Sequence, residues 1–289
     1  MPSPVLSLIL AVPFVLHSTG VARAEPSEAE RIFAKAVQAQ GQFDRDQLKD
    51  IHVRFRGSAR EQDRATTVVR EYWYRTKDRS FRIKTAPQVR LQETSQRGIH
   101  EGKFWETDKR GHAFGLAPGN RDDRKVIRKI QKEREEFEHI LRLLLLARNV
   151  DGKSSIRFAD PPACRLDRDF PIEVRSVLPD RKTRSYHVLR LERAEDPALE
   201  LYVDSTDFTV RKVIQFHAKQ PDLPEWFYYF GPFKRDKATN LLLPQYFSAH
   251  DGLPIDKASR EATTVATGSL RAQINAGVEE ALVPPAPAK

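Results

Sequence analysis

The stretch from Glu200 to Phe216 has the clearest alternation of hydrophobic and polar positions in the chain, on both sides of the polar break Asp204–Asp207. The second arm has its apolar positions at Phe208, Val210, Ile214 and Phe216, interrupted by Lys212. We expect them to face the same interior as the aromatic run Trp226–Phe230. Period-two alternation around an Asp/Ser-rich break predicts a β-hairpin with one buried face. Because a lone hairpin is only marginally stable, further strands must join it.

Short segments of the same kind recur along the rest of the chain. They are Ile51–Arg56, Thr66–Arg75, Phe81–Lys84, Arg90–Gln96, Lys103–Thr107, Gly111–Leu116, Ser155–Phe158, Ile172–Val177, Tyr186–Glu192, Trp226–Phe233, Leu241–Ala249 and Glu261–Arg271. This spacing predicts a meander of antiparallel strands. Thr66–Arg75 carries apolar residues on both of its faces, which a sheet exposed to water on one side would not do. Another element must therefore cover part of the second face.

Two segments have the period of helices. Pro26–Gly41 carries an apolar stripe, with Ser27 placed to cap its start and Gly41 to end it. Asn120–Asn149 is longer, and its second half is apolar nearly all round, which is typical of a buried helix. It lies between two runs of strands and must pack on both. An ordinary core helix and a movable plug are both compatible with this pattern.

The two ends of the chain predict processing and a loose tail. Residues 1–24 are expected to be a signal peptide, since Val5–Leu16 is a short apolar core and Ala22–Ala24 gives a small-x-small cleavage pattern. Residues 286–289 are expected to be a disordered tail, and residues 25–285 a single domain. The only cysteine is Cys164, so no internal disulfide is possible. An exported chain without a disulfide favours the bacterial periplasm.

Charge and motifs exclude several classes of function. The formal net charge is +9, which suits anionic lipid, solubility or nucleic acid, and nucleic acid is the weakest choice for an exported protein. No phosphate-binding loop, nucleophile elbow or zinc-binding helix motif occurs. His100 with Glu101 and His250 with Asp251 are the nearest approaches to an acid–base pair, and at turns we interpret them as solvated. We therefore expect no catalytic residue, cofactor or metal, and a hydrolase is the least favoured class.

Large aromatic side chains are concentrated on the predicted strands, and the run from Trp226 to Phe230 offers rings to both faces of a sheet. A curved sheet with an apolar, partly filled concave face would hold an acyl chain, with each buried methylene contributing about 0.8 kcal/mol. The residues expected to line such a cavity are Tyr72, Trp73, Phe81, Trp105, Leu141, Leu144, Leu145, Phe227, Tyr229 and Phe247.

Four local motifs, in this order, resemble those of the LolA/LolB-type lipoprotein-carrier superfamily. They are Tyr72–Arg75 continuing to Ser80–Arg82, Gly102–Trp105, Leu201–Asp204 continuing to Val210–Val213, and Ala281–Pro285. The resemblance implies a mainly β (α+β) fold. This fold would be a half-open, strongly curved antiparallel β-barrel with an N-terminal helix and a central helical lid or plug. It also implies that a basic residue near the turn after the aromatic strand holds the lid closed, and Arg75 is the match here.

The resulting hypothesis is a non-enzymatic, monomeric periplasmic carrier or sensor, including a role in outer-membrane lipoprotein sorting. Its expected partners are lipid or lipoprotein acyl chains and a membrane-bound donor or acceptor protein, with no nucleic acid. The alternative is a structural or regulatory envelope protein with a filled barrel that binds a protein partner. The volume of the cavity distinguishes the two, because a filled sheet has no room for an acyl chain.

The substitution Leu144→Asp tests the role of the second helix. If this helix is a lid, the variant should fold and bind lipid poorly. If it is a core element, the buried charge should prevent folding. Thermal melting separates these outcomes, and a variant that melts like the wild type and keeps its lipid affinity would contradict both.

Overall fold

The computed structural model describes residues 25–41, 48–61, 64–87, 94–144, 155–159, 164–166, 184–192, 197–251 and 264–285. The predicted signal peptide (1–24), the tail (286–289) and the predicted strand Ile172–Val177 lie outside these ranges. Within them, one antiparallel sheet of fourteen strands dominates the molecule, together with a separate two-stranded ribbon. The prediction of a mainly β chain with few helices is therefore confirmed.

The strands of the first half follow one another as neighbours in the sheet. They are β1 (Asp50–Glu61), β2 (Arg64–Arg75), β3 (Ser80–Pro87), β4 (Ser95–His100), β5 (Lys103–Thr107) and β6 (Ala113–Gly115). The predicted strand Arg90–Gln96 overlaps β4 at Ser95 and Gln96, and its residues 90–93 lie outside the described ranges. Gly98 hides the alternation of β4 because it has no side chain, and a Cβ there would lie 2.3 Å from the carbonyl oxygen of Phe81. Glycine is thus required where β4 approaches β3.

The strands of the second half complete the sheet on the other side of β1. They are β7 (Ser155–Phe158), β8 (Cys164–Leu166), β9 (Ser185–Glu192), β10 (Leu199–Asp204), β11 (Val210–His217), β12 (Gln220–Phe230), β15 (Tyr246–Asp251) and β16 (Thr264–Ile274). The predicted strand Leu241–Ala249 is interrupted at Gln245, so that β14 (Leu242–Pro244) pairs with β13 (Phe233–Arg235) in the separate ribbon. The last strand, β16, returns to pair with β1 at the middle of the sheet.

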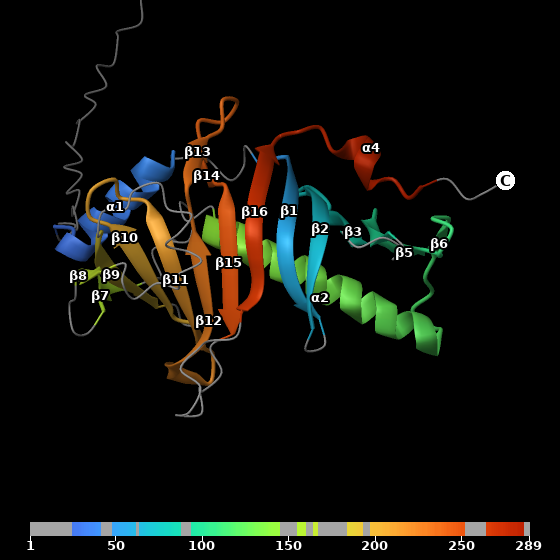
Figure 1. Ribbon diagram of the computed structural model, residues 1–289, viewed down its shortest axis with the longest axis horizontal. Helices are drawn as coiled ribbons and strands as arrows, with labels where there is room; N and C mark the ends of the chain where they lie inside the picture. Colours follow the sequence, from blue (N-terminus) through green and yellow to red (C-terminus); the bar gives the residue numbers. More distant parts are fainter. Residues whose placement is uncertain are drawn as a thin grey trace, which may run out of the picture.

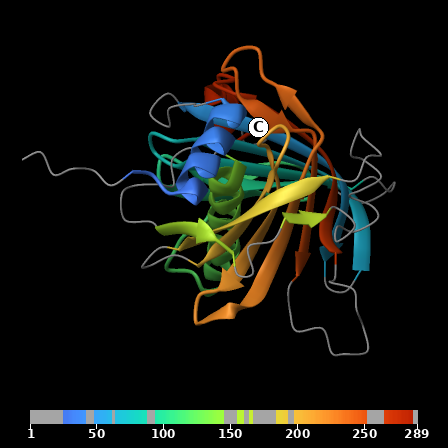
Figure 2. The ribbon, with the colours of Figure 1, turned by 90° about the vertical axis from the view of Figure 1, so that its left-hand side faces the viewer.

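The sheet is strongly curved and is not closed. Its order is β6-β5-β4-β3-β2-β1-β16-β15-β12-β11-β10-β9-β7, so that β6 and β7 are its two ends among the described strands (Figure 1). The expected half-open barrel is therefore an open, curved sheet. Figure 2 shows that this sheet bends around α2 (Arg121–Leu144), which lies in its hollow.

Two further helices pack on the sheet. α1 (Glu28–Gln40) begins at Ser27 with a capping box to Glu30, as the sequence predicts, and buries its apolar stripe in the main core. The short helix α4 (Glu279–Leu282) lies near β2, β3 and β4, where Arg82 donates a hydrogen bond to the carbonyl oxygen of Ala281. α2 packs within the main core through Ile127, Ile130 and Phe137. The helix is therefore a core element, and this packing does not by itself make it a lid.

The sheet is buried on both faces of its second half, which corrects the prediction for the hairpin. Tyr202 lies opposite Lys212 but Val203 lies opposite Val210, so a β-bulge at Arg211 shifts the alternation. Val210 and Val213 consequently join the main core on the concave face. Ile214 and Phe216 turn to the convex face, where they join the outer cluster of Ala159, Tyr186, Val188, Tyr202, Ile214, Phe216 and Tyr229. The four positions expected on one face are thus divided between two.

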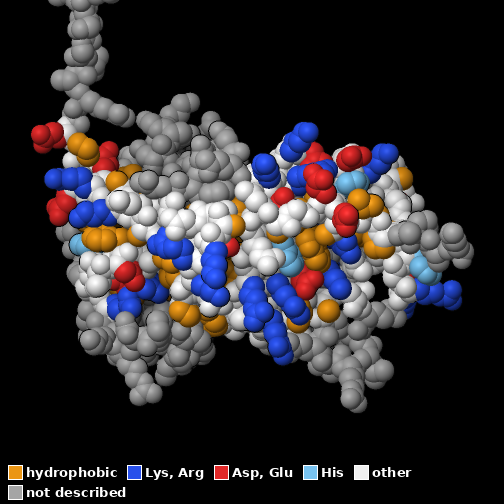
Figure 3. All heavy atoms as spheres, turned by 90° about the horizontal axis from the view of Figure 1, so that it is seen from above, with side chains coloured by type: hydrophobic (Ala, Val, Ile, Leu, Met, Phe, Trp, Pro, Cys, Tyr) orange, Lys and Arg blue, Asp and Glu red, His pale blue; other side chains and the backbone are white. Residues whose placement is uncertain are grey.

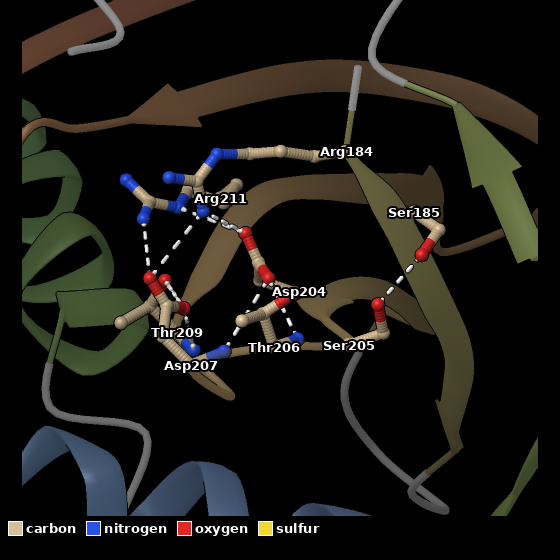
Figure 4. Close-up of polar contacts among 8 residues, drawn as sticks. All are labelled: Arg184, Ser185, Asp204, Ser205, Thr206, Asp207, Thr209 and Arg211. Atoms are coloured by element: carbon tan, nitrogen blue, oxygen red, sulfur yellow. Dashed lines mark hydrogen bonds and ion pairs between the residues drawn. The ribbon is translucent and has the colours of Figure 1, made fainter. Parts of the chain in front are cut away.

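The turn of this hairpin contains a buried ion network (Figure 4). Arg184 and Arg211 both face Asp204, whose side chain is fully buried, and both also contact Asp207. Arg211 Nη2 lies 2.7 Å from Asp207 Oδ2. The other oxygen of Asp204 accepts a hydrogen bond of 2.9 Å from the backbone N–H of Thr206. Asp204 therefore orders the turn, and together with Asp207 it balances the charge of the two guanidinium groups.

Replacing this carboxylate should destabilise the whole fold. Asp204→Ala leaves two buried cations with only the more exposed Asp207, and breaking a buried ion pair in this way costs about 3–5 kcal/mol. Urea unfolding measures the loss. Asp222→Ala, at an exposed position of β12, is the matched control and should change the free energy of unfolding by less than about 0.5 kcal/mol. Equal stability of the two variants would show that the network contributes little.

Candidate functional site

A cavity of about 750 Å³ lies between α2 and the concave face of the sheet. Its floor comes from the five adjacent strands β2, β1, β16, β15 and β12, with β3 at one side. The apolar side chains of this floor are Val53, Phe55, Tyr72, Ile83, Trp226, Tyr228, Phe247, Ala249, Ala266 and Leu270. The roof is α2, which contributes Phe137, Ile140 and Leu141. The cavity is therefore apolar inside and built from segments distant in the sequence.

Cross-strand register explains why these particular side chains meet. Residues directly opposite each other in neighbouring strands point to the same face of a sheet. Tyr72 lies opposite both Val53 and Ile83, which forms one apolar row across β1, β2 and β3. Further rows pair Phe55 with Leu270 and Ala249 with Ala266. The floor follows directly from strand alternation once the order of the strands is known.

The rim of the cavity is charged. α2 contributes Lys129, Lys132, Glu133, Glu135 and Glu136, and the sheet contributes Arg70, Gln215 and Glu225. Gln215 Nε2 donates a hydrogen bond of 3.1 Å to Glu225. An apolar interior with a rim of both charge signs suits an amphipathic molecule, whose polar end stays at the rim while its apolar part enters the cavity.

α2 is attached to one half of the sheet by two carboxylates, the half-buried Glu133 and the buried Glu138. Glu133 receives a bidentate ion pair from Arg97 of β4, with Arg97 Nε 2.7 Å from its oxygen. Glu138 accepts hydrogen bonds from the hydroxyl of Tyr74, at 3.0 Å, and from Arg79, at 2.5 Å. Both attachments lie on the β2–β4 side of the cavity. They fix the height of the helix above the floor there.

An aromatic cluster strengthens the same attachment. The ring of Phe137 lies 5.2 Å from that of Tyr72, 5.9 Å from Tyr74 and 5.8 Å from Phe81. On the other side of the cavity, the ring of His139 lies 6.0 Å from that of Tyr228. The described aromatic contacts of α2 are thus concentrated on β2 and β3.

The environment of Glu138 shifts two pKa values. Burial acts to raise the pKa of Glu138, but hydrogen bonds from Arg79 and Tyr74 outweigh it, so the pKa lies below its ordinary value. Burial, together with the negative charge of Glu138, raises the pKa of Tyr74 to about 12. At neutral pH the carboxylate is therefore charged and the tyrosine is a hydrogen-bond donor. The hydrogen bonds that Glu138 accepts are therefore strongest in the protonation state that prevails at neutral pH.

The structure brings three of the ten expected cavity residues together. Tyr72, Leu141 and Phe247 line the cavity. Phe81 is fully buried below Phe137 in the main core and does not reach the cavity wall. Leu144 ends α2, but its side chain lies outside the described part of the structure, as does the whole of Leu145.

The remaining four expected residues point to the convex face. Trp73 and Trp105 flank the guanidinium of Arg82, at 5.0 and 5.8 Å from their ring centres. Phe227 and Tyr229 lie with the outer cluster, near the ammonium group of Lys212 at 5.4 and 5.5 Å. Each of these four residues is next in the sequence to a residue that faces the cavity or the main core. Neighbouring residues of a strand point to opposite faces, so these four face outward.

The contact expected of Arg75 is made by a neighbour in the same turn. Arg75 forms a bidentate ion pair with Asp78, three residues away, with Nη2 2.6 Å from the carboxylate. Arg79 reaches α2 instead, through Glu138. The reason is geometric, because Arg79 has a positive φ of 54° at the end of the turn, which a sequence pattern does not reveal.

Sequence reasoning missed the charged rim and much of the floor. Arg70 lies two residues before Tyr72 on β2 and therefore points to the same face of the sheet. Its place at the cavity could have been predicted once Tyr72 was expected there. Trp226 and Tyr228 could not be separated from Phe227 and Tyr229 in the same way, because β12 carries aromatic rings on both faces. Only the register with β15 assigns them.

Among the residues that the structure describes, no group of three His, Cys, Asp or Glu side chains could hold a metal ion. In the described ranges, no helix has the length and apolar character needed to cross a membrane. His100 lies on β4 and His250 on β15, so the two pairs are not close in the sheet order. The interpretation as solvated is wrong for His250, which is buried against Tyr229 and lies 2.7 Å from the hydroxyl of Ser248. The cavity is the feature with the clearest capacity to bind a ligand.

Fold and cavity together define a curved antiparallel sheet that holds a helix over an apolar chamber. No family model matches the chain, and no curated protein matches it. Solved structures do resemble it. A LolA superfamily protein from Nitrosomonas europaea has 13% identity over 86% of this chain and 92% of its own, with a TM-score of 0.40.

Two other solved structures give similar values. A domain assigned to outer membrane lipoprotein sorting, from Vibrio parahaemolyticus, has 8% identity over 88% of this chain and 96% of its own, with a TM-score of 0.43. A DUF1329 family protein from Desulfovibrio piger has 8% identity over 89% of this chain and 97% of its own, with a TM-score of 0.44. The alignments with these three structures cover most of this chain. At identities and TM-scores this low the likeness carries no argument about function, which must come from the cavity.

Neutralising Glu138 should weaken the attachment of α2 in a pH-dependent way. Because the folded-state pKa is lowered, the carboxylate contributes fully above its ordinary value of 4.5, and this contribution is lost as the pH falls through the folded-state value. We expect Glu138→Gln to lower the free energy of unfolding by about 1–2 kcal/mol at neutral pH. The difference from the wild type should shrink at about pH 3.

Urea unfolding at both pH values measures this difference. Glu135→Gln, on the exposed side of the same helix, is the control and should change stability by less than about 0.5 kcal/mol at either pH. A Glu138→Gln effect that stays constant between the two pH values would contradict a role for the charge.

Proposed function

We propose that this protein is a non-enzymatic carrier or sensor that binds the acyl chain of a lipid or lipoprotein in the cavity below α2. The observation that carries the proposal is the cavity itself, which has a volume of about 750 Å³ and an apolar floor. Ligand-binding pockets in proteins typically enclose about 300–1,000 Å³. The chamber is large enough for a ligand of that size.

The chemistry of the lining favours an acyl chain over a polar ligand. Ten apolar side chains from the sheet and three from α2 surround the interior, while the charged groups stay at the rim. Each methylene transferred from water into such surroundings contributes about 0.8 kcal/mol. Affinity of this kind needs buried area and shape, and it needs no catalytic group. The charged rim is suited to a polar head group.

In this proposal α2 acts as the lid. Its attachments through Glu133 and Glu138 lie on the β2–β4 side, so the helix could pivot there and open the side that faces β12 and β15. Export to the periplasm is part of the proposal and rests on the signal-peptide pattern of residues 1–24. The likeness to a domain assigned to outer membrane lipoprotein sorting suggests lipoprotein acyl chains as one class of cargo.

The alternative is a structural or regulatory envelope protein that binds a protein partner through a filled sheet. A filled sheet would leave no chamber between helix and floor. The cavity volume therefore supports the carrier over this alternative.

Filling part of the cavity should weaken binding without harming the fold. Ala266 lies on β16 in the cavity floor, and Ala266→Phe places a ring where the acyl chain would lie. Loss of room for two or more methylenes should weaken binding of a fluorescent fatty acyl probe at least about tenfold. Native mass spectrometry of protein purified from a bacterial envelope should show lipid on the wild type and less on the variant.

Ser269→Phe is the matched control, because Ser269 is on the same strand with its side chain exposed on the convex face. It should bind the probe like the wild type. The proposal would be wrong if the wild type neither carries lipid nor takes up the probe, or if both phenylalanine variants bind equally well.

A further inference from the structure

The outward face of α2 carries a continuous stripe of six basic side chains, which we call the basic stripe: Arg121, Arg124, Lys125, Arg128, Lys129 and Lys132. Their spacing of three and four residues places them on one side of the helix. All six are exposed, whereas Ile127, Ile130 and Phe137 on the opposite side are buried in the main core. The stripe covers about 16 Å of the helix at about 1.5 Å per residue.

The stripe is not neutralised within the described residues. Lys132 lies 3.7 Å from Glu136, and both side chains are mostly exposed. The other five have no carboxylate within ion-pair distance in the described ranges. Four like-charged pairs lie four residues apart, and each of them destabilises a helix. Repulsion of this kind is relieved when a surface of opposite charge approaches.

The stripe leads to the mouth of the cavity. Lys129 and Lys132 belong both to the stripe and to the cavity rim. A surface bound along the stripe would therefore lie against the opening through which a ligand enters. Toward the other end of α2 the same outward side becomes acidic at Glu135 and Glu136, so the attraction is confined to the first three turns.

An exposed aromatic side chain lies on the same side of the sheet. Phe114 of β6 is 46% exposed, which is unusual for a large hydrophobic residue in this protein. It lies opposite Glu106, which lies opposite Arg97, and Arg97 binds α2 through Glu133. Phe114 thus faces the same way as the helix. An exposed aromatic ring on the same side as a basic surface adds apolar contact to electrostatic attraction at a membrane interface.

We infer that the basic stripe docks the protein on an anionic lipid bilayer, with the mouth of the cavity turned toward the membrane. Charge complementarity selects the anionic surface, and the shared residues Lys129 and Lys132 place the mouth beside it. The bilayer would be the donor or acceptor of the cargo, so this inference extends the proposed function. Docking is electrostatic and reversible, and it requires no membrane-spanning segment.

Co-sedimentation with vesicles tests the inference. The wild type should bind vesicles that contain phosphatidylcholine and phosphatidylglycerol, should bind pure phosphatidylcholine weakly, and should dissociate as salt is added. The triple variant Arg124→Gln, Lys125→Gln and Arg128→Gln removes three charges and spares the two lysines that line the cavity. It should bind anionic vesicles roughly 100-fold more weakly, since each basic residue near such a surface contributes about fivefold.

The control must remove the same charge elsewhere, because basic side chains also gather on other parts of the surface (Figure 3). Arg54, Arg56 and Arg271 are exposed on the convex face, where Arg54 lies opposite Arg271 across β1 and β16. Their triple replacement by Gln changes net charge equally on the opposite side of the sheet. This control should retain most of the vesicle binding.

Three results would overturn the inference: a wild type that does not bind anionic vesicles, a stripe variant that binds as well as the wild type, or equal losses in both triple variants, which would indicate attraction by net charge alone. Thermal melting checks that both variants fold, and the salt dependence of the wild type provides a second measurement if one does not. The stripe variant should bind the acyl probe normally, so failure of docking and failure of cavity binding are distinguishable.

Discussion

The cavity exists because α2 is attached firmly to one half of the sheet and spans the other half at a distance. Glu133, Glu138 and Phe137 bind β4, the turn after β2 and the aromatic side chains of β2 and β3. Toward β12, β15 and β16 the lining is apolar, and the helix shares the chamber with these strands. The position of every other part of the site depends on this one-sided attachment. The floor, the rim and the basic stripe are all placed relative to the helix that it holds.

Strand alternation predicted much of the fold, since alternation depends on local sequence. The cap at Ser27, the helix beginning after Asn120 and most strands are found where the pattern places them. Strand pairing over long distances is not local, and the register of β16 with β1 is not visible in the sequence. The bulge at Arg211 is similar, because it changes which side chains reach the core without changing the letters around it.

The candidate site was harder to predict, for two physical reasons. A sheet covered on both faces carries apolar residues at successive positions. Alternation alone then cannot show whether Tyr72 or Trp73, and Tyr228 or Tyr229, faces the concave side, and the strand register is needed. Charged contacts depend on backbone angles within turns, as with Arg79 in place of Arg75. The basic residues of α2 are spaced at helical intervals in the sequence, but their meaning depends on knowing that the other side of the helix is buried.

The outer cluster covers the convex face in the second half of the sheet. There Lys212 lies over the rings of Tyr202, Phe227 and Tyr229, so that even a cation is part of the packing. The convex face and the concave face are then both closed around β10, β11 and β12. Of these strands, β12 lines the chamber through Trp226 and Tyr228, and β11 through Gln215.

The pairing of β16 with β1 has a consequence for how the protein is made. These strands lie at the middle of the sheet, and the contact between His52 and Gln273 joins residues 221 positions apart. Contacts between such distant segments form slowly, because a long loop must close first. β16 is synthesised long after β1, so the sheet has no complete hollow until both strands are available. A chain exported as proposed would then complete its fold only after it has crossed a membrane.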